Sequence, residues 1–155
     1  MNKKTIITIL FTAATLALLG AYASQYFFNF KPCILCLYQR IPFFIIAFLC
    51  VFGWFLHEKW QKIVVFLCFL AIFANLGLAL YHVGVEQKIF KITQKCVAIE
   101  QNFATVEELQ QHLAKQELAR CDEPQFVFAK LSMAAWNAVF CLILMVFLGK
   151  YLFRR

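Results

Sequence analysis

The chain has 155 residues, of which 63% are hydrophobic and only 15% are charged, and its mean hydropathy is +0.74. Soluble domains carry about a quarter charged residues, so this composition excludes an ordinary soluble protein and indicates a membrane protein. The net charge of +7 does not indicate nucleic-acid binding, because the basic excess flanks the apolar segments, where it reports membrane orientation.

Four apolar segments are long enough to cross a bilayer, which takes about 20 residues for about 30 Å of hydrocarbon. We expect spans at about residues 5–25, 41–56, 63–83 and 131–149. The second is the shortest, but Tyr38 and Arg40 before it and Trp54 and Trp60 at its far end suit the membrane interfaces. The segments predict an all-α membrane protein, a four-transmembrane-helix bundle in which residues 1–155 form a single domain.

The first segment also resembles a secretory signal, because lysines precede an apolar run and Ala21-Tyr22-Ala23 offers a small-residue cleavage site. The apolar run continues past that site through residues 26–28. Cleavage would leave three spans and put the two ends of the chain on opposite sides of the membrane. We therefore expect an uncleaved first span, with cleavage as the alternative.

Lysine and arginine residues gather at three places that share one side of a four-span topology. They are Lys3, Lys4, Lys59, Lys62, Lys150, Arg154 and Arg155. Because short cytoplasmic loops carry the excess of Lys and Arg, we expect both termini in the cytoplasm. Two outward loops, at about residues 26–40 and 84–130, then face the other side, and acidic residues offset the basic ones in the longer loop.

The seven cysteines divide by location into two groups. Cys50, Cys68 and Cys141 lie within apolar spans, where a cysteine acts as a small buried apolar residue, and we assign them no role. The outward loops contain the other four, Cys33, Cys36, Cys96 and Cys121. Disulfides form on that side of the membrane, so the candidate chemistry lies in the loops.

Cys33 and Cys36 form a CxxC sequence at a predicted helix start, where the two sulfurs can meet in a small reversible disulfide. Zinc would need about four ligands, including His82 or the other loop cysteines. Covalent haem needs a histidine where Leu37 stands. A purely structural disulfide would close only four residues and stabilise little. Thiol–disulfide exchange fits better, since Arg40 and the helix start both favour a thiolate at Cys36.

The second outward loop carries Cys96 and Cys121, 24 residues apart, in a connection long enough to suggest function. Residues 105–108 form a capping-box start, and apolar residues at 106, 109 and 113 repeat with near-helical spacing. We expect a short amphipathic helix here. It would lie at the membrane surface or against a partner, and a merely solvated loop helix is the alternative.

The segment KPCILCLYQR at residues 31–40 resembles the first periplasmic loop of the DsbB family of disulfide bond formation proteins. The resemblance extends to the four spans, the cysteine pair of the second loop, YHVGVE at residues 81–86 and LSMAAWN at residues 131–137. Gln39 stands where the best-known family members carry a glutamate. Nearly the whole chain is covered.

The resemblance implies a membrane thiol oxidase of the bacterial inner membrane. A reduced DsbA-like periplasmic thiol oxidoreductase would attack the disulfide between Cys96 and Cys121, forming a mixed disulfide at Cys96, with Cys121 as the resolving partner. The resulting dithiol would be reoxidised by Cys33 and Cys36. Cys36 would then pass two electrons to a membrane quinone, ubiquinone or menaquinone.

Two further residues are candidates for the quinone site. The resemblance places Arg40 near the quinone ring, and His82 lies near the predicted outer boundary, where it could donate a hydrogen bond or supply protons. Both residues also suit the alternative of an ordinary side chain at the membrane interface that takes no part in the chemistry. Two other functions stay open: a membrane conduit that carries reducing equivalents outward, and a non-enzymatic membrane subunit whose cysteines only link its loops.

Overall fold

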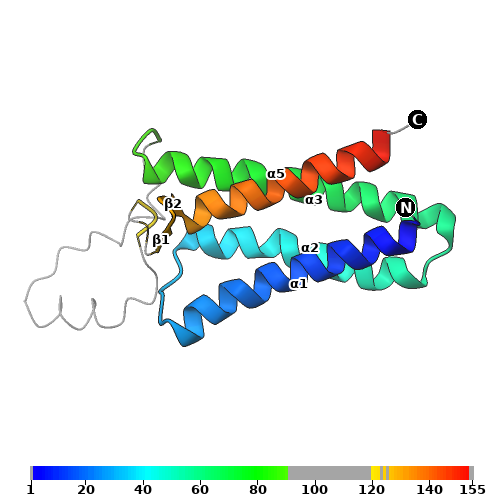
Figure 1. Cartoon of the computed structure of the whole chain (residues 1–155), viewed down its shortest axis with the longest axis horizontal. Helices are drawn as coiled ribbons and strands as arrows, with labels where there is room; N and C mark the ends of the chain where they lie inside the picture. Colours follow the sequence, from blue (N-terminus) through cyan, green and yellow to red (C-terminus); the bar gives the residue numbers. More distant parts are fainter. Residues whose placement is uncertain (1, 91–119, 123, 125, 154–155) are drawn as a thin grey trace, which may run out of the picture.

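The computed structural model describes residues 2–90, 120–122, 124 and 126–153. Its elements, drawn in Figure 1, are α1 (Lys3–Phe27), α2 (Ile34–Phe55), α3 (Glu58–Glu86), β1 (Val127–Phe128), β2 (Leu131–Ser132) and α5 (Met133–Phe153). The four helices are each long and apolar enough to cross a membrane. This confirms the predicted all-α membrane protein with four transmembrane helices. Cys96 and the amphipathic helix expected near residues 105–113 lie outside the described residues.

The second span differs most from its predicted bounds, because α2 begins at Ile34 rather than near residue 41. Cys33 caps this helix, and its sulfur accepts the backbone N–H of Cys36. The polar residues Gln39 and Arg40 therefore lie inside the helix, and the first outward connection is shorter than expected. Pro42, which suits a first helical turn, lies in the interior of α2, where its ring removes one backbone hydrogen bond.

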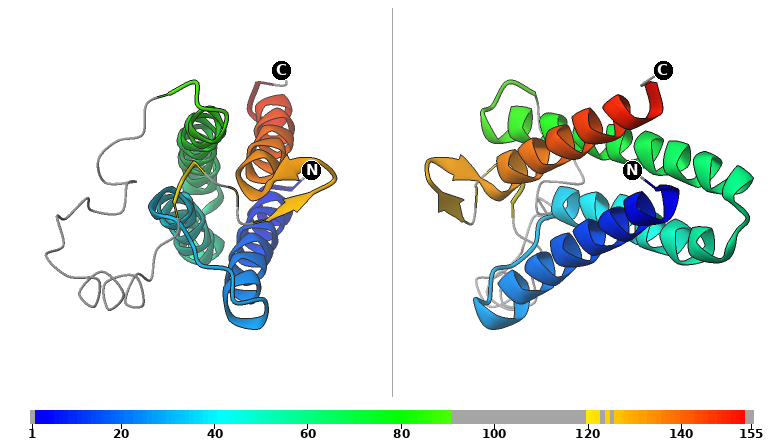
Figure 2. Two further views of the ribbon diagram at one scale, coloured as in Figure 1. Left: turned by 90° about the vertical axis from the view of Figure 1, so that its left-hand side faces the viewer. Right: turned by 45° about the vertical axis from the view of Figure 1, so that its right-hand side comes forward.

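The helices pack in a definite order: α2 contacts both α1 and α3, and α3 also contacts α5. Figure 2 shows the bundle from one end and from an oblique direction. One continuous core joins all four helices, with Leu10 of α1, Ile46 of α2, Ile72 of α3 and Leu148 of α5 almost fully buried. α1 and α5 are not closely packed against each other. We call the boundary between these two helices the α1–α5 seam.

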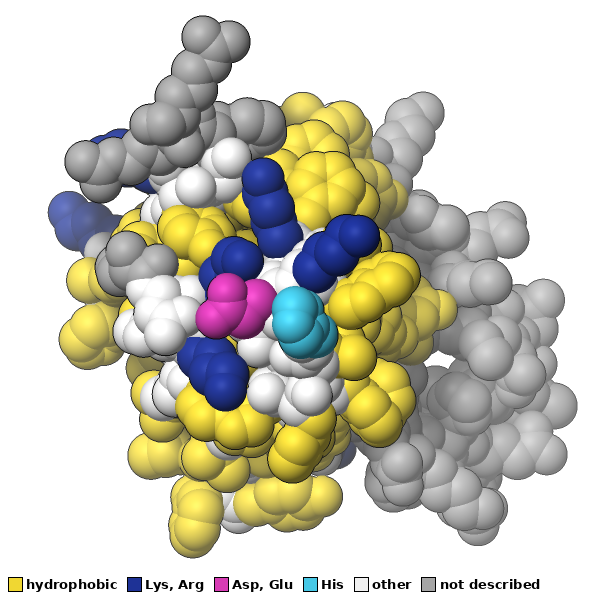
Figure 3. Space-filling view, turned by 90° about the vertical axis from the view of Figure 1, so that its right-hand side faces the viewer, with side chains coloured by type: hydrophobic (Ala, Val, Ile, Leu, Met, Phe, Trp, Pro, Cys, Tyr) yellow, Lys and Arg dark blue, Asp and Glu magenta, His cyan; other side chains and the backbone are white. Residues whose placement is uncertain are grey.

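The two ends of the bundle differ in chemistry. Both ends of the chain lie at one end of the bundle (Figure 1), and Figure 3 shows Lys and Arg side chains gathered on that face. Lys3 there lies 3.9 Å from a carboxylate oxygen of Glu58. At the opposite end lie Cys33 and the β1–β2 hairpin, in which Val127 pairs with Ser132. The described basic residues that predicted orientation thus lie at the end of the bundle opposite the CxxC sequence; they are Lys3, Lys4, Lys59, Lys62 and Lys150.

Gly53 of α2 lies close against Val64 of α3. A Cβ atom at this position would lie 2.8 Å from Cγ1 of Val64, whereas nothing lies within 4 Å of a Cβ at Gly77. We expect Gly53→Ala to lower the free energy of unfolding by about 1–3 kcal/mol, because the buried Val64 has little room to move. Gly77→Ala should be neutral or stabilising. Thermal unfolding of both variants in detergent measures the difference, and equal effects would contradict the close approach.

Candidate functional site

The start of α2 brings two thiols together. Cys33 is the N-cap residue and Cys36 lies in the first helical turn, so their sulfur atoms are 2.9 Å apart. The backbone N–H of Cys36 donates to the sulfur of Cys33 at 3.2 Å. Cys33 is 4% exposed, and Cys36 is half-buried. The helix start thus holds a dithiol that needs only a small movement to close into a disulfide.

A third cysteine, from the second outward loop, joins this pair. Cys121 is 1% exposed and packs in a small buried cluster with Cys33 and Val85, and it hydrogen-bonds with Cys33. Arg120 and Asp122 flank it and form an ion pair at 2.7 Å. The hydrogen bond from Arg120 holds the pKa of Asp122 below its usual range. The structure therefore brings together three of the four loop cysteines, and Cys96 lies outside the described residues.

Ionisation of Cys33 depends on its two sulfur neighbours. The hydrogen bond with Cys121 acts to lower its pKa, but the hydrogen bond with Cys36, burial and negative charge on Cys36 outweigh that effect. Together they raise the pKa of Cys33 to about 12. Once Cys36 is a thiolate, Cys33 therefore keeps its proton across the physiological pH range. The reduced pair then carries one negative charge rather than two.

This arrangement predicts that Cys36→Ala lowers the pKa of Cys33. Removing the neighbouring thiolate removes both its charge and its hydrogen bond, so the pKa of Cys33 should fall from about 12 towards the ordinary thiol range. The rate of Cys33 alkylation against pH, followed by peptide mass spectrometry, measures the change. Cys50→Ala is the matched control, because Cys50 is a buried cysteine deeper in α2. An unchanged Cys33 profile in Cys36→Ala would contradict the coupling.

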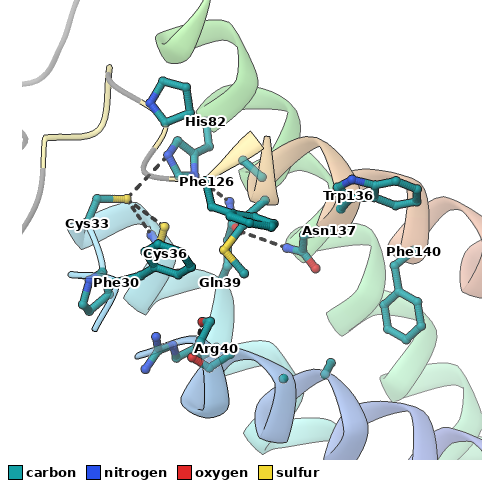
Figure 4. Close-up of a pocket in the computed structure, with 18 of the residues that line it drawn as sticks. Phe30, Cys33, Cys36, Gln39, Arg40, His82, Phe126, Trp136, Asn137 and Phe140 are labelled. Carbon is teal, nitrogen blue, oxygen red and sulfur yellow. Dashed lines mark hydrogen bonds between the residues drawn. The ribbon is translucent and has the colours of Figure 1, made fainter. Parts of the chain in front are cut away.

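His82 lies beside the thiols and not in the lipid interface. It is 2% exposed, its Nε2 atom lies 3.5 Å from the sulfur of Cys33, and its Nδ1 atom lies 3.1 Å from Nε2 of Gln39. Asn137 of α5 donates to the Gln39 side-chain oxygen at 3.0 Å. Figure 4 shows these side chains pointing towards one another from α2, α3 and α5. The bundle thus contains a hydrogen-bonded polar group next to the sulfurs.

Sequence reasoning did not single out Gln39, Asn137 or Glu86 as site residues. Glu86 lies one helical turn after His82. One of its carboxylate oxygens lies 3.8 Å from Nε2 of His82, and the other accepts a hydrogen bond from Ser132. The available signal was their polarity within or beside apolar spans, because polar residues inside a membrane are costly and usually functional. Gln39 also follows Cys36 by three residues, which places both on one helix face.

A cavity of about 370 Å³ lies next to the sulfur pair, with walls from α1, α2 and α5 and the outer end of α3. Its lining is mostly apolar and includes Phe43, Trp136 and Phe140 together with Cys36 and His82. Figure 4 shows several of these side chains around it. Because α1 and α5 contribute opposite walls, the cavity lies along the α1–α5 seam.

Arg40 of α2 contributes a positive charge to the lining of this cavity. One guanidinium nitrogen donates to the side-chain oxygen of Gln25 at 3.0 Å, and the guanidinium carbon lies 4.8 Å from the centre of the Tyr22 ring. Within the described ranges, no carboxylate forms an ion pair with Arg40. Both contacts orient the guanidinium without neutralising it, so it retains donors for an oxygen-bearing ligand in the cavity.

The same thiols also have the ligand types that bind soft metal ions. The ligand atoms of Cys33, Cys36 and His82 lie within 4.8 Å of one another. A structural zinc site uses about four ligands in a closed tetrahedron, whereas this group borders a cavity with apolar walls. The surroundings therefore favour an organic ligand beside a reactive dithiol.

Comparison with known proteins agrees with this reading of the site. Residues 3–150 match the family described as disulfide bond formation protein DsbB. A protein of Rickettsia prowazekii (strain Madrid E), described as uncharacterized, is 27% identical over 148 residues, which cover 94% of this chain and 85% of that protein. The family match spans all four helices and the CxxC sequence. The chain therefore belongs to the DsbB family of membrane proteins that act in disulfide bond formation.

Proposed function

We propose that this chain is a membrane thiol oxidase that reoxidises a DsbA-like periplasmic dithiol protein and passes the electrons to a membrane quinone. The observation that carries the proposal is the position of the Cys33–Cys36 pair. Cys33 contacts Cys121 of the second loop, and Cys36 lines an apolar cavity on the α1–α5 seam. Cys33 lines the same cavity, so the pair lies between the loop cysteine that would deliver the electrons and the cavity that would hold their acceptor.

The proposed exchange begins when a partner thiolate attacks Cys96, forms a mixed disulfide and releases Cys121 as a thiolate. Cys121 then attacks the neighbouring Cys33, breaks the Cys33–Cys36 disulfide and releases Cys36 as a thiolate. The partner's second thiolate resolves the mixed disulfide and frees Cys96, which attacks Cys121, restores the loop disulfide and releases Cys33. The net change is one disulfide formed in the partner and one reduced to a dithiol here, with two electrons and two protons transferred.

The cavity has properties that suit a quinone. Its volume of about 370 Å³ lies within the common range of about 300–1,000 Å³ for small-molecule sites. Its aromatic and aliphatic walls suit a quinone ring and its isoprenoid tail, and Arg40 would hold a carbonyl oxygen through its free donors. When bound, a quinone would accept the two electrons and two protons released as the Cys33–Cys36 disulfide re-forms.

The energetics require such an acceptor. A DsbA-like dithiol has a potential of about −120 mV, and about 30 mV corresponds to 1.4 kcal/mol for two electrons. Only a more oxidising final acceptor can therefore keep the partner oxidised. A quinone that is dissolved in lipid reaches a dithiol only where that dithiol borders the membrane, and a position at the start of a helix long enough to cross the membrane supports such access.

The same proposal assigns an orientation in the bacterial inner membrane. The gathered Lys and Arg side chains would face the cytoplasm together with both termini. The sulfur cluster at the other end would then face the periplasm, where disulfides persist. After reduction, an impermeant thiol reagent applied to intact cells should label Cys96, and in Cys36→Ala it should also label Cys33. Labelling of these cysteines from opposite sides of the membrane would exclude the relay.

The decisive experiment combines purified protein, a reduced DsbA-like partner and quinone without oxygen. We expect one quinone to be reduced for each partner disulfide formed. Repeating the reaction with Cys96→Ser should abolish turnover. A reduced partner that lacks its second cysteine should accumulate as a mixed disulfide with Cys96 of the wild-type enzyme, because nothing resolves that bond. Partner oxidation without quinone reduction, or electron flow from the membrane to the partner, would favour a reductant conduit instead.

A further inference from the structure

A chain of side-chain hydrogen bonds runs from α5 through α2 to α3 and ends at the sulfur of Cys33 (Figure 4). The Cys141 thiol donates to the side-chain oxygen of Asn137 at 3.7 Å, and Asn137 donates from Nδ2 to Oε1 of Gln39 at 3.0 Å. Nε2 of Gln39 then lies 3.1 Å from Nδ1 of His82, and Nε2 of His82 lies 3.5 Å from Cys33. The chain therefore links three helices to the redox pair.

Each group in this chain constrains the orientation of the next. An amide has one accepting end and one donating end, so Asn137, whose oxygen accepts from Cys141, presents its N–H groups to Gln39. The oxygen of Gln39 accepts one of them, and its own N–H group faces His82. Because an amide N–H can only donate, Nδ1 of His82 must be the unprotonated acceptor. A neutral imidazole then carries its hydrogen on Nε2, the atom that faces Cys33.

Burial makes the opposite arrangement costly. Gln39 is 7% exposed and His82 is 2% exposed, so water offers little substitute for a lost partner. A proton on Nδ1 would require both amides to turn over together, and it would place the N–H group of Asn137 against the sulfur of Cys141, which is only a weak acceptor. The complete loss of an acceptor by a buried donor costs about 1–3 kcal/mol, so this poor substitute carries part of that cost.

We propose that Gln39 and Asn137 are positioning residues that hold His82 in the tautomer protonated at Nε2, so that it donates a hydrogen bond to Cys33. Two other acceptors compete for a hydrogen of this imidazole. One is the backbone of Cys121, with which His82 also forms a hydrogen bond, and the other is Glu86, whose carboxylate accepts from Ser132. The sulfur of Cys33 lies closer to Nε2 than the Glu86 oxygen does, at 3.5 Å against 3.8 Å.

The consequence lies in which form of Cys33 is stabilised. An N–H that points at sulfur favours the thiolate, whereas a nitrogen lone pair in the same place disfavours it. Cys33 is a leaving group in the proposed exchange, so this hydrogen bond would make its release easier. The tautomer itself is independent of the proposed function, and only this kinetic consequence rests on that proposal.

The tautomer can be read directly by NMR of protein labelled with ¹⁵N-histidine. The chain has three histidines, and His57→Gln and His112→Gln assign the signals of His82 by elimination. We expect the wild-type Nδ1 to show the shift of an unprotonated nitrogen and Nε2 that of a protonated one. Asn137→Asp should reverse this pattern, because a carboxylate only accepts and would turn the Gln39 oxygen towards His82.

A matched control separates this effect from the burial of a carboxylate as such. Gln61→Glu also replaces a buried amide, but it lies at the opposite end of α3, near the start of that helix. It should leave the nitrogen shifts of His82 unchanged. The wild-type measurement decides the question even where Asn137→Asp does not fold, since a proton on Nδ1 in the wild type overturns the proposal.

The reactivity of Cys33 provides the second readout. In a Cys36→Ala background, Asn137→Asp should slow the alkylation of Cys33 at neutral pH by roughly ten-fold, because the sulfur loses a donor to its thiolate. An unchanged tautomer or an unchanged rate in Asn137→Asp would overturn the inference. The expected tautomer switch in a protein that does not couple thiol oxidation to quinone would support the inference while refuting the proposed function.

Discussion

Cys36→Ala is expected to reduce the oxidation of a DsbA-like partner by about three orders of magnitude or more, because Cys33, the other cysteine of the cavity lining, cannot re-form the disulfide alone. Cys33 also hydrogen-bonds with Cys121, which leaves Cys36 to react with the ligand of the cavity. Turnover assays with quinone in excess measure the loss, and a single round of exchange with the Cys96–Cys121 disulfide should still occur.

The matched control for this variant is Cys50→Ala, which removes a buried sulfur from the same helix at a distance from the cavity lining. It should retain turnover close to that of the wild type. Substantial quinone-linked turnover in Cys36→Ala would contradict the assignment of the CxxC pair, and an equal loss in both variants would point to a structural rather than a chemical effect.

Arg40→Met is expected to raise the KM for quinone by roughly 10- to 100-fold. The methionine keeps the apolar stem of the side chain but removes the charged donors, and a hydrogen bond to a charged group is worth about 1.5–3 kcal/mol. Steady-state kinetics with varied quinone measure the KM. The single round of exchange with a reduced partner, in the absence of quinone, should slow much less, because Arg40 contacts Gln25 and Tyr22 and acts on Cys36 only through its charge.

Two further variants sharpen this test. Arg40→Lys retains the charge and should lose less affinity, though it lacks the planar guanidinium that pairs with two acceptor sites. Gln25→Ala leaves the cation but removes its hydrogen-bonded support, so its KM should rise only modestly. A KM unaltered by Arg40→Met would exclude Arg40 from the quinone site.

The number and type of membrane helices followed from the sequence because hydrocarbon thickness sets a minimum apolar length. The helix start at the CxxC sequence was predicted, but the second span was expected only from residue 41, because Gln39 and Arg40 were treated as residues outside the lipid. In the structure, Gln39 satisfies its amide with His82 and Asn137, so a polar side chain is tolerated within the helix. Charge-free length measures a span poorly when the polar residues bond inside the bundle.

The candidate site was predictable only in part, for a related reason. The CxxC spacing and the helix start identified Cys33 and Cys36 from local geometry alone. The contact between Cys121 and Cys33 joins residues far apart in the chain, and no local pattern encodes it. Asn137 and Glu86 likewise acquire partners only when α5 and α3 pack at the outer end of the bundle.

Because α1 and α5 are loosely packed against each other, the ligand concentration that governs this protein is the concentration within the membrane. A cavity that borders the boundary between these helices is reached sideways, by molecules that diffuse within the sheet of lipid. Occupancy then depends on the mole fraction of ligand among the lipids rather than on its amount per litre of buffer. Diluting vesicles with water should leave the rate per enzyme unchanged, whereas fusing them with ligand-free lipid should slow it.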